Sequence, residues 1–376
     1  MVIQSIELQN YRNYPHLVVE FHPGINIFYG DNAQGKTNIL EAVYLCGTNK
    51  SHRGSKDREI IAFGQDEAHI KMYTKRDSME NRIDMHLKKG KSKGIAINGV
   101  PIHKVSELFG MVNIVFFSPE DLQIIKNGPS ERRKFIDLEL CQLDKLYIYD
   151  LVNYNRSLQQ RNRLLKEAVD KKEFLAMLEI WEAQLVKFGK PIIHRREKFI
   201  HQLNPILTAI HRNLTGGKEE LIMVYDPDTE PEQLELALCK NRDRELKQKT
   251  TMSGPHRDDI RFIINGIDIR TFGSQGQQRS AALSLKLAEI ELVKQQIKDV
   301  PILLLDDVLS ELDSNRQNYL LDSMQGIQTM ITCTGLDDFI NHRFHMDHIF
   351  HVVQGTVIKE NGSSETGNDV NNCNLQ

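Results

Sequence analysis

The chain has 376 residues, of which 40% are hydrophobic and 26% are charged, and its formal net charge at pH 7 is −3. This length and balance predict a globular protein with a substantial core, made of one large or two ordinary domains. The slightly negative charge excludes a globally basic protein, so any nucleic-acid surface must be a local patch.

Cysteine usage and apolar runs predict the compartment. The five cysteines are scattered without a C-x-x-C pair, which indicates neither a disulfide framework nor a zinc site and suits a reducing cytosol. No apolar run approaches the roughly 18 residues that a membrane span requires, and the N-terminus lacks a basic-then-apolar signal pattern. We therefore expect a cytoplasmic protein without membrane contact.

Residues 1–30 alternate apolar and polar side chains and turn at Pro23-Gly24, which predicts a β-meander. Between its first two strands lies Asn-Tyr-Arg-Asn-Tyr, residues 10–14. An ordinary turn is one interpretation of this segment. Because it lies near the phosphate loop described next, Arg12 and Asn13 are also candidate nucleotide contacts.

Residues 30–37 read Gly-Asp-Asn-Ala-Gln-Gly-Lys-Thr and fit G-x-x-x-x-G-K-[ST], the phosphate loop. An apolar strand precedes the loop and helical apolar spacing follows it, which argues against a chance glycine turn. Amides at the helix N-terminus would point at the β- and γ-phosphates of a triphosphate, Lys36 would add a positive charge, and the Thr37 hydroxyl would occupy one Mg²⁺ position. The candidate nucleotide-binding residues here, which the resemblance described below assigns to ATP, are Gly30, Asp31, Asn32, Ala33, Gln34, Gly35, Lys36, Thr37 and Asn38.

Residues 68–117 are predicted to be rich in strands, and from about residue 129 apolar residues recur at helical spacing. This second stretch predicts an antiparallel helical arm. Gly189, Pro191, Pro205 and Gly216-Gly217 interrupt the pattern, so a long coiled-coil rod is not expected. Strand and helix signals then return and end in a hairpin over 348–359.

The helical stretch therefore interrupts a single α/β phosphate-loop domain. We expect a nucleotide-binding head formed by residues 1–125 and 250–360, an inserted helical arm over 126–249, and a disordered tail over 361–376. The tail is rich in Asn, Gly, Ser and Asp and has no apolar period.

The strand Ile302–Leu305 leads directly into Asp306 and Asp307. In a phosphate-loop fold, an acid at this point reaches the metal ion from beside the loop, so Asp306 is the metal-side candidate. Asp307 can orient or deprotonate the attacking water. An apolar strand that ends in acids by chance is the alternative.

Ser274-Gln275-Gly276-Gln277-Gln278-Arg279 opens a long predicted helix. The serine would cap the helix, and Gly276 would let a backbone amide approach an anion. Since one nucleotide needs only one cradle, this second anion site indicates a γ-phosphate held by another subunit. A simple helix N-cap is the alternative.

With these segments in order, the chain resembles the ABC-type ATPases of the SMC/Rad50 kind, and more closely the RecF family of recombination mediators. The resemblance spans nearly the whole chain. Beyond the segments above, it rests on Ser51–Arg53, Phe117–Leu122, Gly128–Arg133, Ser253–Asp259 and Leu305–Asp313.

The resemblance implies a fold and site roles. The fold would be an ABC-type head, with a mixed sheet, flanking helices and an antiparallel β subdomain. Lys36 and Thr37 would bind phosphates and Mg²⁺, Asp306 and Asp307 would form the Walker B pair, and Glu120 would lie in a metal-sensing loop. Ser274, Gly276 and Gln277 would form the signature that closes on a partner's ATP.

Two departures from the ABC pattern affect the expected chemistry. Most ABC enzymes have glutamate where this chain has Asp307, so we expect slow turnover, a weak DNA-stimulated ATPase used as a switch. Thr332-Cys333-Thr334 stands where many have a switch histidine, which puts that role in doubt.

The family also implies partners. ATP would join two chains head to tail into a dimer that binds DNA at single-strand/double-strand junctions, and hydrolysis would release the DNA. RecF proteins act with RecO and RecR to load RecA at gaps, with a link to the SOS response. Candidate DNA contacts are Lys50, His52, Arg53, Lys56, Arg58, Arg132, Arg133 and Lys134, each of which could equally be part of a solvated face.

Three rival classes fit less well. A transporter nucleotide-binding subunit would carry Leu-Ser-Gly-Gly-Gln and a switch histidine, and the chain has neither. A small-molecule kinase would have no use for Ser274–Arg279. A Rad50-like break protein would need a long rod and a zinc hook, which the sequence does not indicate.

Overall fold

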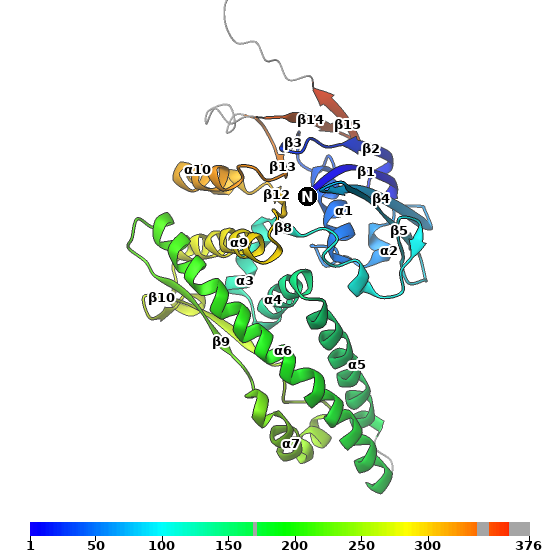
Figure 1. The fold of residues 1–376 in the computed structure, drawn as a ribbon, viewed down its shortest axis with the longest axis vertical. Helices are drawn as coiled ribbons and strands as arrows, with labels where there is room; N and C mark the ends of the chain where they lie inside the picture. The colour runs from blue at the N-terminus through cyan, green and yellow to red at the C-terminus, as the bar shows by residue number, and fades with distance from the viewer. Residues whose placement is uncertain (168–170, 337–345, 361–376) are drawn as a thin grey trace, which may run out of the picture.

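The computed structural model describes residues 1–167, 171–336 and 346–360. Two β-sheets lie together at one end of an elongated molecule, and helices extend from them to the other end (Figure 1). The predicted disordered tail over 361–376 lies outside the described residues. None of the helices in the described ranges is long and apolar enough to cross a membrane.

The central sheet combines strands from both halves of the chain. Its order is β15-β14-β3-β13-β12-β8, with every pair parallel except β14 and β15. The strands are β3 (Ile25–Tyr29), β8 (Ile114–Phe117), β12 (Ile302–Asp306), β13 (Thr329–Cys333), β14 (His348–Val353) and β15 (Thr356–Glu360). This parallel pairing aligns the carboxyl ends of β3, β12 and β13 at one edge, where a ligand site is expected.

The second sheet is antiparallel and has the order β2-β1-β4-β5-β6-β7. Its strands are β1 (Val2–Tyr11), β2 (Tyr14–Glu20), β4 (Glu67–Arg76), β5 (Met79–Lys88), β6 (Gly94–Ile97) and β7 (Val100–Pro101). The predicted meander over residues 1–30 is wrong for its third strand, because β3 leaves this sheet for the central one. The first four residues of β3 are all buried, which is typical of a parallel strand covered on both faces.

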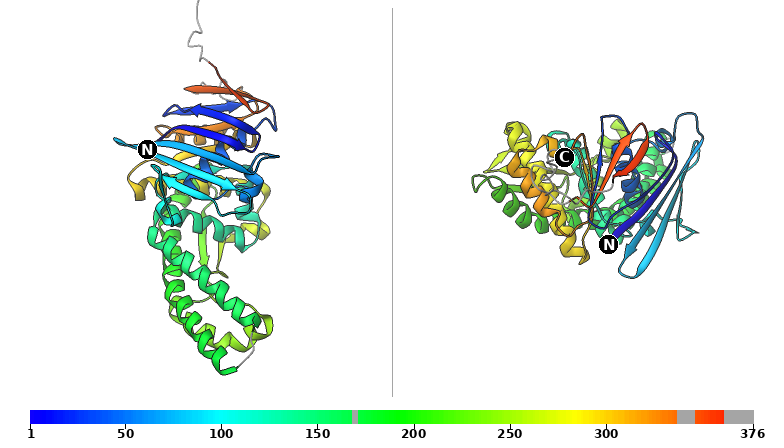
Figure 2. Two further views of the ribbon diagram at one scale, coloured as in Figure 1. Left: turned by 90° about the vertical axis from the view of Figure 1, so that its right-hand side faces the viewer. Right: turned by 90° about the horizontal axis from the view of Figure 1, so that it is seen from above.

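Helix α1 (Lys36–Thr48) lies between the two sheets (Figure 2). Its buried residues share one core with Ile70 and Met72 of the antiparallel sheet and with Leu304 and Met330 of the central sheet. The helix therefore begins at the phosphate loop and is held by both sheets.

Four helices form the part that extends away from the sheets: α4 (Pro129–Leu143), α5 (Lys145–Glu167), α6 (Lys171–Leu214) and α7 (Leu234–Gln248). The predicted interruption is wrong for α6, since this helix of 44 residues continues through Pro191 and Pro205. Each proline costs about 3 kcal/mol in a helix interior. Burial of Ile192, Leu203 and neighbouring side chains in the main core offsets that cost.

A small sheet with the order β11-β10-β9 joins the arm to the head. β9 (Leu221–Asp226) pairs antiparallel with β10 (Asp259–Ile264), which pairs with β11 (Ile267–Asp268). β9 comes before the domain boundary expected at residue 249 and β10 comes after it, so the small sheet contains strands from both expected domains. The division into head and arm stays a prediction.

The remaining elements are short, apart from one long helix. They are α2 (Asp57–Ile60), α3 (Leu122–Lys126), α8 (Ile269–Phe272), α9 (Gln275–Ile297), α10 (Ser314–Ser323), η1 (Val105–Glu107), η2 (Pro119–Asp121), η3 (Pro231–Gln233) and η4 (Leu309–Glu311). The long helix α9 is buried along most of its length, which fixes the orientation of its exposed first turn.

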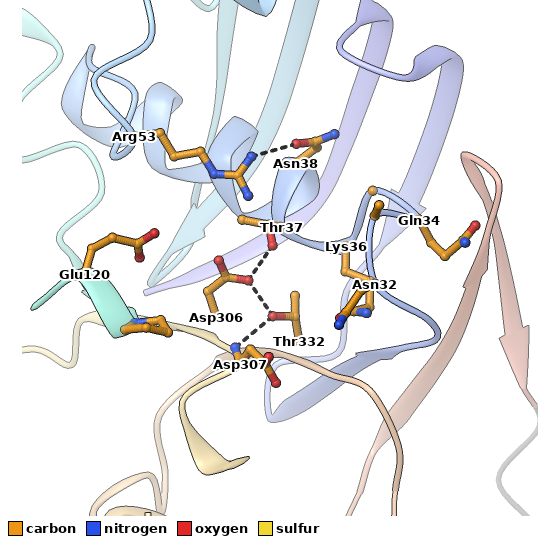
Figure 3. A pocket seen from close by; sticks show the side chains of 13 residues that line it. Asn32, Gln34, Lys36, Thr37, Asn38, Arg53, Glu120, Asp306, Asp307 and Thr332 are labelled. Atoms are coloured by element: carbon orange, nitrogen blue, oxygen red, sulfur yellow. Dashed lines mark hydrogen bonds between the residues drawn. The ribbon is translucent and has the colours of Figure 1, made fainter. Parts of the chain in front are cut away.

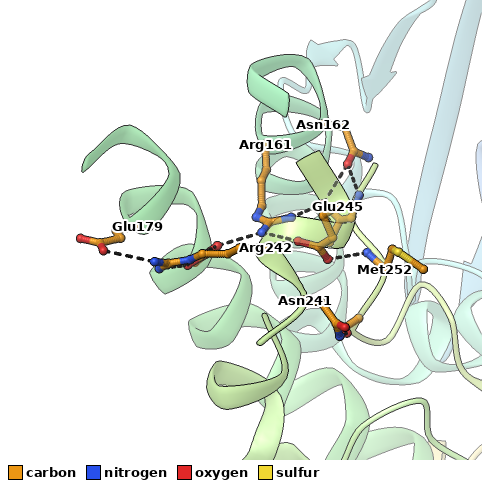
Figure 4. A network of polar contacts seen from close by, with 10 residues as sticks. Arg161, Asn162, Glu179, Asn241, Arg242, Glu245 and Met252 are labelled. Carbon is orange, nitrogen blue, oxygen red and sulfur yellow. Dashed lines mark hydrogen bonds and ion pairs between the residues drawn. The ribbon is translucent and has the colours of Figure 1, made fainter. Parts of the chain in front are cut away.

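A buried ionic network joins the helices of the arm (Figure 4). Arg161 on α5 is fully buried and donates to Glu182 on α6 at 2.8 Å and to Glu245 on α7 at 2.6 Å. Arg242 also pairs with Glu182, and the Thr251 hydroxyl accepts from Arg161 at 2.9 Å. The network therefore ties three helices to the segment that returns to the head.

Candidate functional site

The phosphate loop joins β3 to α1 with a shape that requires glycine. Gly30 and Gly35 have φ of 145° and 113°, a region that side chains rarely adopt. A Cβ on Gly35 would lie 2.4 Å from the side-chain nitrogen Nδ2 of Asn13 and 2.7 Å from the Tyr14 hydroxyl. The loop is thus packed against the β1–β2 turn and leaves its other side open.

Lys36 is the first residue of α1 and is 7% exposed. Its ammonium donates to the carbonyl oxygens of Gly30 and, at 2.8 Å, of Asp31. Burial lowers the pKa of Lys36, and the nearby Asp307 opposes that shift. Neutral carbonyls satisfy this charge, so an anion in the loop would provide a stronger partner.

The carboxylate of Asp306 accepts two hydroxyl hydrogen bonds. Thr37 Oγ1 and Thr332 Oγ1 each lie 2.6 Å from Asp306 Oδ1. The Thr37–Asp306 pair brings two oxygen ligands from distant segments together, and oxygen donors are what Mg²⁺ prefers. These residues therefore fit a Mg²⁺ ion beside the phosphate loop.

Thr332 is a residue whose role the sequence did not reveal. The sequence indicated only the lack of a histidine near this position. Asp306 and Thr332 are direct partners in the parallel pairing of β12 and β13, which explains the contact. Aligning the two strands by their ends would have missed this contact, because that alignment places Thr332 opposite Leu305.

Asp307 adopts a left-handed backbone conformation with φ of 52°. Its amide donates to the carbonyl and the hydroxyl of Thr332, at 3.2 and 3.1 Å. The Ser310 hydroxyl donates to the Asp307 carbonyl at 3.0 Å. These contacts hold the Asp307 carboxylate at the edge of the loop cavity, where it can act on a water molecule.

A cavity of about 370 Å³ lies over the phosphate loop, and most of the predicted residues border it (Figure 3). Its walls are Asn32, Ala33, Gln34, Gly35, Lys36, Thr37, Asn38, Arg53, Pro119, Glu120, Asp306, Asp307 and Thr332. Gly30 and Asp31 line a neighbouring cavity of about 330 Å³ together with Tyr29 and His351, whose rings stack 4.7 Å apart. The predicted loop and Walker B residues thus converge.

Glu120 and Arg53 approach this cavity from outside the loop. Glu120 lies on η2 and is exposed at the wall, and its metal-sensing role stays a prediction. Arg53, expected among the DNA contacts, also lines the wall, and its guanidinium lies 3.5 Å from the Asn38 side-chain oxygen. This places a second cation besides Lys36 at the phosphate site.

Arg12 and Asn13 are not among the residues that line the 370 Å³ cavity. The Arg12 guanidinium pairs with the buried Glu41 through two bonds of 2.8 Å. The Asn13 amide donates to the Gln34 carbonyl at 3.0 Å and accepts from Asn38 at 2.7 Å. In this structure the two residues support the loop and α1, and the Arg12 guanidinium also donates to the Glu59 carbonyl and the Ser55 hydroxyl.

The signature segment forms a capping box at the start of α9. The Ser274 hydroxyl accepts from the Gln277 amide at 3.2 Å, and the Gln277 side chain accepts from the Ser274 amide at 2.9 Å. Gln277 also donates to Glu219 at 2.9 Å. Ser274 and Gly276 are exposed, and none of the three borders the 370 Å³ cavity.

The structure corrects two of the candidate DNA contacts. Arg132 is 2% exposed and makes a bidentate pair with Asp259, so it is a structural residue. The two ring nitrogens of His52 are buried, and the ring packs against Phe116. Arg133 is half-buried and donates to the Asp258 carbonyl, whereas Lys50, Lys56, Arg58 and Lys134 are exposed.

Comparison with known proteins supports a single family. Residues 2–357 match the family model described as the RecF/RecN/SMC N-terminal domain. The DNA replication and repair protein RecF of Lachnoclostridium phytofermentans is 60% identical over 359 residues, which cover 96% of this chain and 100% of that protein.

Solved structures show the same relationship. A solved structure of the recombination mediator protein RecF-ATP in the RecFOR pathway has a TM-score of 0.89 at 36% identity, covering 96% of this chain and 97% of that one. An Smc head domain from Pyrococcus furiosus shares the fold, with a TM-score of 0.55 at 18% identity over 95% of this chain and 96% of that one. From the matching residues and the shared fold, the chain belongs to the RecF family of DNA replication and repair proteins.

Proposed function

We propose that the chain is an ATP-dependent DNA-binding protein of recombinational repair and replication. The single observation that carries this proposal is the convergence of Lys36, Thr37, Asp306 and Asp307 on one cavity. Two related solved structures are of RecF-ATP and of RecF-ATPrS, which supports ATP as the ligand of this family member.

The residues of the cavity divide the chemistry among them. Loop amides and Lys36 would bind the phosphates, while Thr37 and Asp306 would hold Mg²⁺. Bound Mg²⁺ would neutralise charge that develops on the transferred phosphoryl group. Asp307 orients the attacking water and accepts its proton.

The exposed signature supports a site shared between two chains. Ser274, Gly276 and Gln277 border no part of their own chain's loop cavity, although their amides begin a long helix. In the proposed dimer, the first turn of α9 from one chain binds the γ-phosphate held by the other. Hydrolysis opens the dimer and releases DNA.

The exposed residues Lys50, Lys56, Arg58 and Lys134, with the half-buried Arg133, are the proposed DNA contacts. Because they would bind phosphates, affinity should fall steeply with salt. The proposed setting is the cytoplasm, at single-strand/double-strand junctions of gapped DNA. There the dimer would act with RecR and RecO to load RecA, with a link to the SOS response.

Sedimentation velocity with ATP, ADP or no nucleotide tests the proposal, in the presence and absence of duplex DNA. Wild type should form a DNA-retaining dimer only with ATP, and Lys36→Met and Ser274→Arg should remain monomeric. Ser78→Arg adds the same charge at an exposed turn between β4 and β5 and should dimerise like wild type. Normal dimerisation by Ser274→Arg would instead identify a site contained within one chain.

A further inference from the structure

A group of potential metal ligands lies on the antiparallel sheet, away from the nucleotide cavity. Glu67 and His69 are two residues apart on β4, so their side chains share one face. His86 on β5 is the direct cross-strand partner of His69. One ligand atom from each of these three residues lies within 4.8 Å of the other two.

Both imidazoles direct a nitrogen at the same carboxylate. His86 Nε2 lies 3.2 Å from Glu67 Oε2, and His69 Nε2 lies 3.9 Å from Glu67 Oε1. The two rings stack with centroids 4.3 Å apart and planes inclined by 10°. In tetrahedral zinc sites, bonds of about 2.0–2.2 Å to nitrogen and oxygen place neighbouring ligand atoms roughly 3.3–3.5 Å apart. The ligand atoms are close enough to meet that geometry once one imidazole rotates out of the stack, because a metal ion must lie in the plane of each ring that binds it.

We infer that Glu67, His69 and His86 form a Zn²⁺ site on the outer face of the antiparallel sheet. Two imidazoles and one carboxylate are a set that zinc binds with a fourth position open to water. Mg²⁺ prefers oxygen ligands throughout, which separates this site from the Thr37–Asp306 pair. The site joins two neighbouring strands, so bound Zn²⁺ stabilises the folded chain through linkage.

Lys88 competes with Zn²⁺ for the carboxylate of Glu67. Its ammonium lies 3.0 Å from Glu67 Oε2, the same oxygen that faces His86. A cation bound by Glu67 must displace this contact and is repelled by the lysine charge. Removing that charge should tighten Zn²⁺ binding, whereas removing a ligand should weaken it.

Isothermal titration of the full-length chain with Zn²⁺ alone, in excess Mg²⁺ and without nucleotide, tests the site. A Cys239→Ser background removes an exposed thiol that could bind zinc by itself. His16→Gln is the control, since His16 lies on β2, separated by β1 from the strand of His69, roughly 10 Å away. Circular dichroism establishes that each variant is folded.

The expected result is one Zn²⁺ per chain, with affinity at least about tenfold weaker in His69→Gln and in His86→Gln. His16→Gln should match the background protein, and Lys88→Gln should bind more tightly. Co²⁺ should give a visible spectrum of tetrahedral type in the background protein and in neither ligand variant. Unchanged affinity in both ligand variants, an equal loss in His16→Gln, or weaker binding in Lys88→Gln would each overturn the assignment.

Discussion

Thr37 donates a hydrogen bond of 2.6 Å to Asp306, joining the first turn of α1 to the end of β12 across 269 positions of sequence. Thr332 donates to the same carboxylate oxygen. The two hydroxyls fix the orientation of this buried carboxylate beside the phosphate loop. The pair is the point at which the two halves of the chain form one site.

Asp306→Asn should lower Mg²⁺-dependent ATP hydrolysis by at least about tenfold, because the amide keeps the shape and removes the charge that binds the metal. Nucleotide binding measured without Mg²⁺ should change little. Steady-state hydrolysis across a Mg²⁺ titration checks this. Asp322→Asn, at an exposed position of α10, is the control. If Asp306→Asn reaches the wild-type rate of ATP hydrolysis and needs no more Mg²⁺ than wild type to do so, Asp306 is not a metal ligand.

Gly35→Ala should destabilise the chain by about 1–3 kcal/mol and abolish nucleotide binding. The new Cβ would occupy a left-handed conformation and meet Asn13 and Tyr14. Gly128→Ala is the matched control, since its Cβ meets nothing within 4 Å and its φ is −72°. Thermal unfolding and fluorescent-nucleotide titration measure both effects. Equal behaviour of the two variants would contradict this explanation of the loop.

Arg161→Met should lower the free energy of unfolding by about 3–5 kcal/mol, because Glu245 is left buried and without its charged partner. Arg163→Met removes the same charge two residues along the same helix. Its side chain is 72% exposed and pairs with Glu167 at the surface, so the loss should be far smaller than that of Arg161→Met. Urea unfolding measures both, and a similar small loss for each would show that the buried network contributes little.

His256 should make stability depend on pH. Burial lowers its pKa from 6.5 to about 4, so between these values the unfolded chain binds a proton that the folded chain does not. The free energy of unfolding of wild type should therefore fall relative to that of His256→Gln by about 3 kcal/mol between pH 7 and pH 4.

Wild type and His256→Gln must be compared at each pH, because a second group also changes stability over this range. Burial raises the pKa of Asp121 to about 6, so protonation of Asp121 increases the free energy of unfolding as the pH falls, in both proteins. Chemical denaturation at several pH values measures the difference. His201→Gln, at an exposed position of α6, controls for the loss of a surface histidine. A difference between wild type and His256→Gln that stays constant with pH would contradict the predicted burial effect.

The sequence determined those parts of the site that lie within one short segment. The phosphate loop, the helix after it and the acids after β12 follow from local spacing, because each depends on backbone geometry and apolar period over about ten residues. The capping box of Ser274 and Gln277 is likewise local and is present in the structure.

Contacts between distant segments were decided only by tertiary structure. β3 joins the central sheet, α6 continues through two prolines, and Arg132 is buried against Asp259, because packing energies there exceed local preferences. The register of β12 with β13 brings Thr332 to Asp306, and that of β4 with β5 brings His69 to His86. No local pattern encodes these pairings, since register depends on which faces of two separate strands are buried together.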